Sequence, residues 1–322
     1  MTFEILIFLK RTTILQTTVI LWHNVIITVH KLTEECMKSI IENKIFDEER
    51  ALYFTQDADI KNCTFAGPAD GESVLKESRD VRLFDCTFSL RYPLWHVKKF
   101  EMTNCSMDDL TRAAIWYSTD GKISTSNLFG IKAVRECSRI QIENSKIISP
   151  EFGWKSSFIS LVNSEVDSEY IFMDSSNVSL KNVQMKGKYS FQYMKNLLIE
   201  DSTLDTKDAF WHSQNVTVKN SVLKGEYLAW FSDGLTLINC KISGTQPLCY
   251  CKNLRLENCT MENCDLSFEY SDVQAEICGH IDSVKNPKSG IIICDSVGEI
   301  IRGDEVMECT GQVKIRNCCK CA

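Results

Sequence analysis

Three side chains in the second half of the sequence suit acid–base chemistry: Asp208, His212 and Glu226. Carboxylates and an imidazole are the groups that a carbohydrate-active enzyme uses, one as the acid and another as the base. Glu226 lies well beyond the other two in the chain, so the three meet only if the chain folds back in a regular way. If the protein is an enzyme, we expect its chemistry here, but the catalytic residues stay unassigned.

Aromatic side chains surround these three residues at a regular spacing. Rings with interspersed carboxylates suit a flat polar ligand, above all a sugar, because its C–H faces stack on rings while its edges form hydrogen bonds. The candidate ligand-binding residues are Tyr193, Asp208, Phe210, His212, Glu226, Phe231 and Tyr250. A simpler interpretation is that like residues stack on like residues and stabilise parallel strands. An exposed apolar column is also typical of a protein contact.

Two enzyme classes have signatures that this sequence lacks. A polygalacturonase-like hydrolase should show aspartate pairs on a strand and a Gly-His-Gly turn. Here Asp108 and Asp109 lie at an inserted corner, and the nearest match to the turn, at residues 279–281, ends in isoleucine. A lyase needs an acidic calcium-binding column, and the repeat provides none. We therefore favour a non-catalytic binding module for a glycan or a protein, with a polysaccharide lyase or hydrolase and a purely structural scaffold as alternatives.

Composition limits the partners and the compartment. A net charge of −7 argues against nucleic acid or an acidic membrane surface, and no apolar stretch is long enough for a transmembrane helix. The chain has 16 cysteines, but the cluster at its end has no histidine partner, so we expect no metal site and no cofactor. The first residues resemble a signal peptide poorly, which predicts a cytoplasmic protein with reduced thiols. The oligomeric state is left open.

A repeat determines the elements that position these residues. From Asp85 to Ile277 one pattern returns: apolar–x–apolar–x–Asn/Asp–small–x–apolar. Its corner residues are Asp85, Asn104, Thr125, Asn144, Asn163, Asn182, Asp201, Asn220, Asn239, Asn258 and Ile277. They are spaced by 19 and 21 residues and then by 19 residues eight times in succession. A fixed period of this length is the signature of a solenoid.

Each repeat predicts short strands separated by a tight corner. Apolar residues alternate before the corner, as at Ile140 and Ile142, and this period of two indicates a half-buried strand. One repeat cannot bury its own apolar face, so successive turns must stack and pair in parallel. Asparagine and aspartate tolerate the left-handed conformation of a one-residue corner. Leucine-rich and hexapeptide repeats do not fit. We predict an all-β, single-stranded right-handed parallel β-helix with about 19 residues per rung.

The repeat also predicts the domain organisation. Because a solenoid grows without a single core, residues 37–322 are expected to form one domain, and residues 1–36 an extension outside it. The irregular segment 39–59 is the candidate cap for the first rung, since an open strand edge needs protection. Strands near Ile291–Ile293 and Val313–Ile315 are expected to close the other end.

The third side of each rung carries five of the six tryptophans in one column: Trp95, Trp116, Trp154, Trp211 and Trp230. Alternation with charged neighbours predicts that this column points inward. The apolar column one residue earlier is then expected to point outward: Leu94, Ile115, Phe172, Phe191, Phe210 and Leu248. Arg135 falls in the tryptophan column, where it is expected either to stack on Trp116 and Trp154 or to be displaced by a bulge.

Several motifs resemble those of an uncharacterised, mostly bacterial protein family. They are EERALYF (Glu48–Phe54), DGESVLKES (Asp70–Ser78), YPLW (Tyr92–Trp95), RAAIWY (Arg112–Tyr117), DAFW (Asp208–Trp211), GEYLAW (Gly225–Trp230), LSFEYS (Leu266–Ser271) and IDSVKNPKSG (Ile281–Gly290). The resemblance extends from Lys38 to the last strands. It implies a single right-handed β-helix of the pectate-lyase-like kind, and it implies no catalytic residue.

Overall fold

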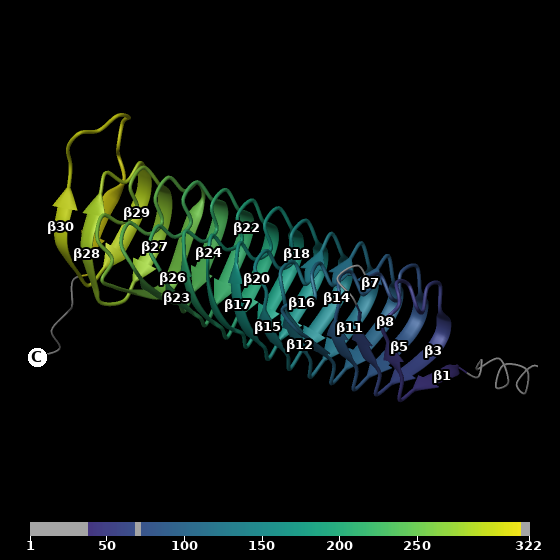
Figure 1. Ribbon diagram of the computed structural model, residues 1–322. Coiled ribbons are helices and arrows are strands. Elements are labelled where there is room, and N and C mark those ends of the chain that lie inside the picture. The colour runs from purple at the N-terminus through teal and green to yellow at the C-terminus, as the bar shows by residue number, and fades with distance from the viewer. Residues whose placement is uncertain (1–37, 68–71, 317–322) are drawn as a thin grey trace, which may run out of the picture. The chain divides into compact units, whose positions relative to one another are not determined.

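Strands of successive turns lie side by side along a coil (Figure 1). This computed structural model describes residues 38–67 and 72–316, so the predicted extension, residues 1–36, lies outside the described residues. The coil belongs to the unit that begins at Ile41. All regular elements among the described residues are β-strands, and they form a parallel solenoid of about 14 turns with rungs about 19 residues apart. The predicted parallel β-helix is therefore confirmed.

Sheet A takes one strand from each turn of the coil. Its strands pair in parallel and in register, so that Ile140 lies beside Ile159 and Gln141 beside Ser160. The isoleucines are buried whereas Gln141 is exposed, as the period of two predicts. Beyond β1 (Ser39–Glu42), these strands are β3 (Gln56–Lys61), β5 (Arg79–Phe84), β8 (Lys98–Thr103), β11 (Thr119–Ser124), β14 (Ser138–Glu143), β16 (Ser157–Val162), β18 (Ser176–Lys181), β20 (Lys195–Glu200), β22 (Gln214–Lys219), β24 (Asp233–Ile238), β26 (Leu254–Glu262), β27 (Asp272–Ile277), β29 (Ser289–Cys294) and β31 (Gln312–Ile315).

Sheet B follows sheet A after a corner of one residue. The corner is left-handed, with φ of 50° at Asn144 and 52° at Asn182. Corner amides bond from turn to turn: Asn182 Nδ2 donates to Asn163 Oδ1 at 2.9 Å. The strands of sheet B are β2 (Ile45–Phe46), β4 (Thr64–Ala66), β6 (Thr87–Ser89), β9 (Ser106–Met107), β12 (Asn127–Phe129), β15 (Lys146–Ile148), β17 (Glu165–Glu169), β19 (Gln184–Lys188), β21 (Thr203–Lys207), β23 (Val222–Lys224) and β25 (Lys241–Ser243). The long β26 pairs into both sheets.

The third side of the coil is only partly β-structure. In the earlier turns it holds short parallel strands, β7 (Leu94–Trp95), β10 (Ile115–Trp116) and β13 (Val134–Arg135). In later turns every second residue is left-handed, with φ of 55° at Tyr189, 59° at Phe191 and 56° at Tyr193. These residues donate their backbone N–H alternately to the following and the preceding turn. The third side is therefore hydrogen-bonded to both adjacent turns, although its backbone is not extended.

Because of this backbone, two buried residues alternate with two more exposed residues along the third side. Ser190 and Phe191 are buried, whereas Gln192 and Tyr193 are partly or fully exposed. Strict alternation holds only for extended strands, so the predicted alternation fails here. The prediction of an inward tryptophan column is wrong, because all five tryptophans are partly exposed. The column that was expected to point outward is instead buried: Leu94, Ile115, Phe172, Phe191, Phe210 and Leu248.

The two ends of the coil differ in how well they were predicted. The segment expected to be an irregular cap already contains a rung, because β2 pairs with β4 and Asn62 Nδ2 donates to Asn43 Oδ1 at 2.7 Å. At the other end β29 and β31 extend sheet A, as predicted. Beside them β28 (His280–Lys285) and β30 (Ser296–Ile301) form a separate two-stranded sheet. Among the described residues, no helix has the length and apolar character needed to span a membrane.

The buried ring of Phe191 tests the corrected orientation of the third side. It stacks on Phe172 and Phe210, with ring centroids 6.3 and 5.2 Å apart. Replacing Phe191 with Ala leaves a cavity and should lower the free energy of unfolding in urea by about 3–5 kcal/mol. The matched control is Phe158→Ala, since Phe158 is 58% exposed and its loss should cost no more than about 0.5 kcal/mol. Equal losses in the two variants would contradict the buried position of Phe191.

Candidate functional site

Four of the predicted ligand-binding residues form one stacked column, here named the outer aromatic column: Tyr193, His212, Phe231 and Tyr250. Successive ring centroids are 5.2, 5.1 and 4.8 Å apart, and the planes differ by 6°, 9° and 16°. Tyr193 is 48% exposed and Phe231 is 44% exposed. Because the rings cover one another's faces, the column presents mainly ring edges to solvent.

Phe210 does not belong to this surface. Its side chain is only 1% exposed and stacks on Phe191 inside the coil. The prediction that Phe210 points outward is therefore wrong, and its ring is not available to a ligand on this surface. The cause is the left-handed backbone of the third side, with φ of 62° at Phe210 itself, which turns this position inward where simple alternation turns it outward.

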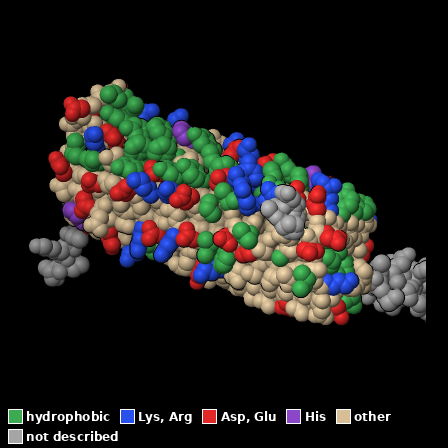
Figure 2. Space-filling model, viewed as in Figure 1, with side chains coloured by type: hydrophobic (Ala, Val, Ile, Leu, Met, Phe, Trp, Pro, Cys, Tyr) green, Lys and Arg blue, Asp and Glu red, His purple; other side chains and the backbone are tan. Residues whose placement is uncertain are grey.

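Two tryptophans that were expected inside lie behind the outer aromatic column. The indoles of Trp211 and Trp230 stack with centroids 5.5 Å apart and planes 4° apart. Each indole Nε1 donates to a backbone oxygen of the next turn, at 3.0 Å to Tyr227 O and 2.9 Å to Gln246 O. Both rings also meet Phe231 edge to face. In Figure 2 hydrophobic side chains gather over the rungs that Figure 1 colours green and yellow.

The acidic residues of the predicted site are in different environments. Asp208 is only 7% exposed, and burial raises the pKa of its carboxyl group above the ordinary value, with the charge of Lys207 opposing the shift and that of Glu226 adding to it. Glu226 is exposed and accepts a hydrogen bond from Lys207 Nζ at 2.9 Å. The same ammonium group lies 5.3 Å from the ring centroid of Tyr227.

The three residues that suit acid–base chemistry have different partners and do not act as a unit. The imidazole of His212 is held between the rings of Tyr193 and Phe231, whereas Glu226 is held by Lys207. Within residues 38–67 and 72–316, no group of three His, Cys, Asp or Glu side chains is placed to hold a metal ion.

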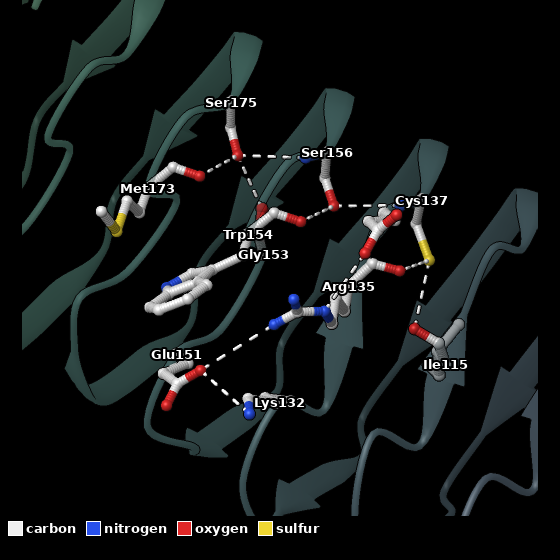
Figure 3. Close-up of polar contacts among 11 residues, drawn as sticks. Ile115, Lys132, Arg135, Cys137, Glu151, Gly153, Trp154, Ser156, Met173 and Ser175 are labelled. Atoms are coloured by element: carbon white, nitrogen blue, oxygen red, sulfur yellow. Dashed lines mark hydrogen bonds and ion pairs between the residues drawn. The ribbon is translucent and has the colours of Figure 1, made fainter.

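Arg135 continues the tryptophan column in the earlier turns (Figure 3). Its guanidinium carbon lies 5.8 Å from the ring centroid of Trp116 and 5.4 Å from that of Trp154. Arg135 Nη1 is 3.9 Å from Glu151 Oε2, which also lies 3.2 Å from Lys132 Nζ. The predicted stacking of Arg135 on both indoles is confirmed, although it takes place on the outer surface.

Sequence reasoning missed a hollow on the outer face of sheet A. Phe158, with its ring exposed, lies at the edge of this hollow among hydroxyl and amide side chains. The available signal was weak: at the equivalent position of later turns the sequence has Asn177, Asn196 and Asn215, and Phe158 interrupts this polar series.

A family model described as "Protein of unknown function (DUF3737)" matches residues 39–316. The chain belongs to this family. No curated protein matches the chain in sequence. The family match agrees with the resemblance carried by the sequence motifs, and it assigns no activity.

Several solved parallel β-helix structures are similar to the chain. They include the surface adhesin PfbA of Streptococcus pneumoniae (10% identity, TM-score 0.42, covering 81% of this chain and 80% of that one), the catalytic domain of a GH87 α-1,3-glucanase (10%, 0.31, 85% and 63%) and the A-module of the mannuronan C-5 epimerase AlgE4 of Azotobacter vinelandii (12%, 0.30, 86% and 91%). At these identities and TM-scores, the likeness assigns neither a fold nor a function to this chain.

Removing the buried carboxyl group of Asp208 should raise the thermal stability of the protein by an amount that depends on pH. Folding raises the pKa of this carboxyl group above 3.8. The group's contribution to the stability of the folded state is therefore fully present below pH 3.8, and it is lost as the pH rises through the raised pKa. Asp208→Asn should therefore melt at a higher temperature than the parent at pH 7, and the difference should vanish below pH 3.8. Thermal unfolding followed by circular dichroism across this range measures it.

The matched control is Asp205→Asn, because Asp205 is an exposed aspartate on the neighbouring strand β21. Its melting temperature should follow that of the parent at every pH. A melting temperature for Asp208→Asn that stays below the parent at pH 7 would show that the Asp208 carboxylate is stabilised in the fold.

Proposed function

We propose that the protein is a non-catalytic binding module and that it contacts a carbohydrate through the outer aromatic column. The observation that carries this proposal is the first ring of the column, Tyr193. It is 48% exposed, and among the described residues its only ring contact is with His212. One face of Tyr193 is therefore not covered by another ring, and it offers the flat apolar surface on which the C–H face of a sugar stacks.

The remaining predicted residues supply polar contacts around that face. Ring edges carry partial positive charge and suit hydroxyl oxygens, so Phe231 contributes through its edge. The hydroxyl group of Tyr250 is a hydrogen-bond donor at neutral pH, and burial raises its pKa further. Glu226, which is exposed, can accept hydrogen bonds from sugar hydroxyls, whereas Asp208 is too buried to offer them its carboxylate.

The geometry of the acidic residues favours binding over catalysis. Glycoside hydrolysis requires two carboxyl groups on either side of the bond that breaks. Glu226 is instead engaged with Lys207, and Asp208 is almost entirely buried. His212, the remaining acid–base group, has rings on both faces.

A protein partner is the second candidate, and the hydrophobic surface favours it. The outer aromatic column presents ring edges, Trp211 and Trp230 beside it are partly exposed, and Figure 2 shows hydrophobic side chains gathered over the later rungs. Exposed aromatic surface of this kind is typical of protein contacts. A protein could cover these edges without needing a free ring face.

The proposal includes the cytoplasmic location expected from the sequence. The described cysteines are free thiols, among them Cys86 and Cys105, which lie on adjacent turns. Neighbouring thiols in an oxidising compartment are usually joined as disulfides. A cytoplasmic location would keep these thiols reduced.

The test is binding of the full-length protein to a glycan array, followed by a thermal-shift titration with each sugar that binds. Tyr193→Ala should weaken binding about tenfold, because it removes the stacking face. The matched control is Tyr117→Ala, which removes another exposed tyrosine of the third side, one that packs on Trp116. Its binding should equal that of the parent.

Two results would count against the proposal. If the two tyrosine variants bound a sugar equally well, the outer aromatic column would not be its site. If the folded parent bound no sugar on the array, the carbohydrate proposal would fail and the protein contact would take its place.

A further inference from the structure

The outer face of sheet A carries a long polar groove. Lys122, Gln141, Ser160 and Ser179 lie side by side on β11, β14, β16 and β18, because these strands pair in register. The hollow along them has a volume of about 530 Å³. Two hollows of about 380 and 390 Å³ adjoin it and share its lining residues. The groove therefore extends over several turns along the coil.

Phe158, at the edge of this groove, is an exposed ring on a left-handed backbone. Its backbone is left-handed, with φ of 56°, a conformation that a bulky side chain adopts only at a cost. The ring is 58% exposed, so burial does not repay that cost. No other ring and no cation stacks on Phe158 within the described part of the chain.

The equivalent residues of the next turns show what this position usually holds. Asn196 Nδ2 donates to Asn177 Oδ1 at 3.1 Å, and Asn215 Nδ2 donates to Asn196 Oδ1 at 3.3 Å. Asparagine accommodates a positive φ more readily and links one turn to the next. Phe158 forgoes both advantages and gives the groove an open aromatic face.

Two of the three charged side chains in the hollow of about 530 Å³ neutralise each other. Arg139 donates two hydrogen bonds to Asp120, from Nε to Oδ1 at 2.5 Å and from Nη2 to Oδ2 at 2.9 Å. Hydrogen bonding to Arg139 lowers the pKa of Asp120 to about 2, so the pair stays ionised at neutral pH. Lys122 is the third charged residue in the hollow, and the other polar groups are hydroxyls and amides.

We propose that this groove is a binding site for an extended, uncharged polysaccharide chain. One sugar ring stacks on Phe158 through its C–H face, and its neighbours along the coil bond to the amide of Gln141 and the hydroxyls of Ser160 and Ser179. An uncharged ligand fits the hollow beside Phe158, because Asp120 and Arg139 neutralise each other there and Lys122 is the one other charged residue of its lining. The inference stands on the geometry of sheet A and does not require the outer aromatic column to bind anything.

The test is electrophoresis of the full-length protein in native gels that contain a soluble β-glucan, α-glucan, xylan or galactomannan. At least one of these polysaccharides should retard the parent. Phe158→Asn should bind it about tenfold more weakly, because the stacking face is lost. Its melting temperature should not fall, since asparagine suits the left-handed backbone. Phe158→Tyr, which keeps the ring, should bind as the parent does.

Tyr193→Ala distinguishes this groove from the outer aromatic column. It should leave the retardation unchanged if the groove is the site. Retardation that is lost in Tyr193→Ala and kept in Phe158→Asn would overturn the groove and support the column. A parent that none of the four polysaccharides retards would also overturn the groove, whereas array binding that depends on Tyr193 would still stand.

Discussion

In-register stacking of each turn on the next is the constraint on which the rest of this structure depends. Strands of sheets A and B bond to equivalent strands about 4.8 Å away along the coil, so every side chain lies beside its counterparts in neighbouring turns. A residue type that suits one turn is therefore repeated in the next. Corner asparagines exchange amide hydrogen bonds, as between Asn163 and Asn182, and the buried phenylalanines around Phe191 stack on one another.

The same stacking limits where the protein can offer a ring face to a ligand. Rings in a continuous column cover one another, and only the edges remain for contact. A face is left open where a column begins or is interrupted. Tyr193 begins one column, because the equivalent residue one turn earlier is Asp174. Phe158 interrupts another, between Arg139 and Asn177. The column and the groove thus place their candidate contacts at breaks in the repeat.

Ion pairs between neighbouring turns occupy much of the charged surface. Asp120 and Arg139, Glu169 and Lys188, and Glu226 and Lys207 each occupy equivalent positions one turn apart and neutralise each other. Arg135 similarly takes the place of a ring between two indoles. Each pair joins two successive turns and follows directly from the in-register stacking.

The sequence by itself determined sheets A and B, because a 19-residue period, alternating aliphatic residues and an asparagine corner are local signals with one structural solution. The third side was decided only by the tertiary structure. There the left-handed residues bond to turns on both sides. The resulting backbone directs Phe210 inward and the tryptophans outward. Phe158 reads in the sequence as one more apolar residue beside a strand; its open face exists only because folding places it between turns that carry no ring.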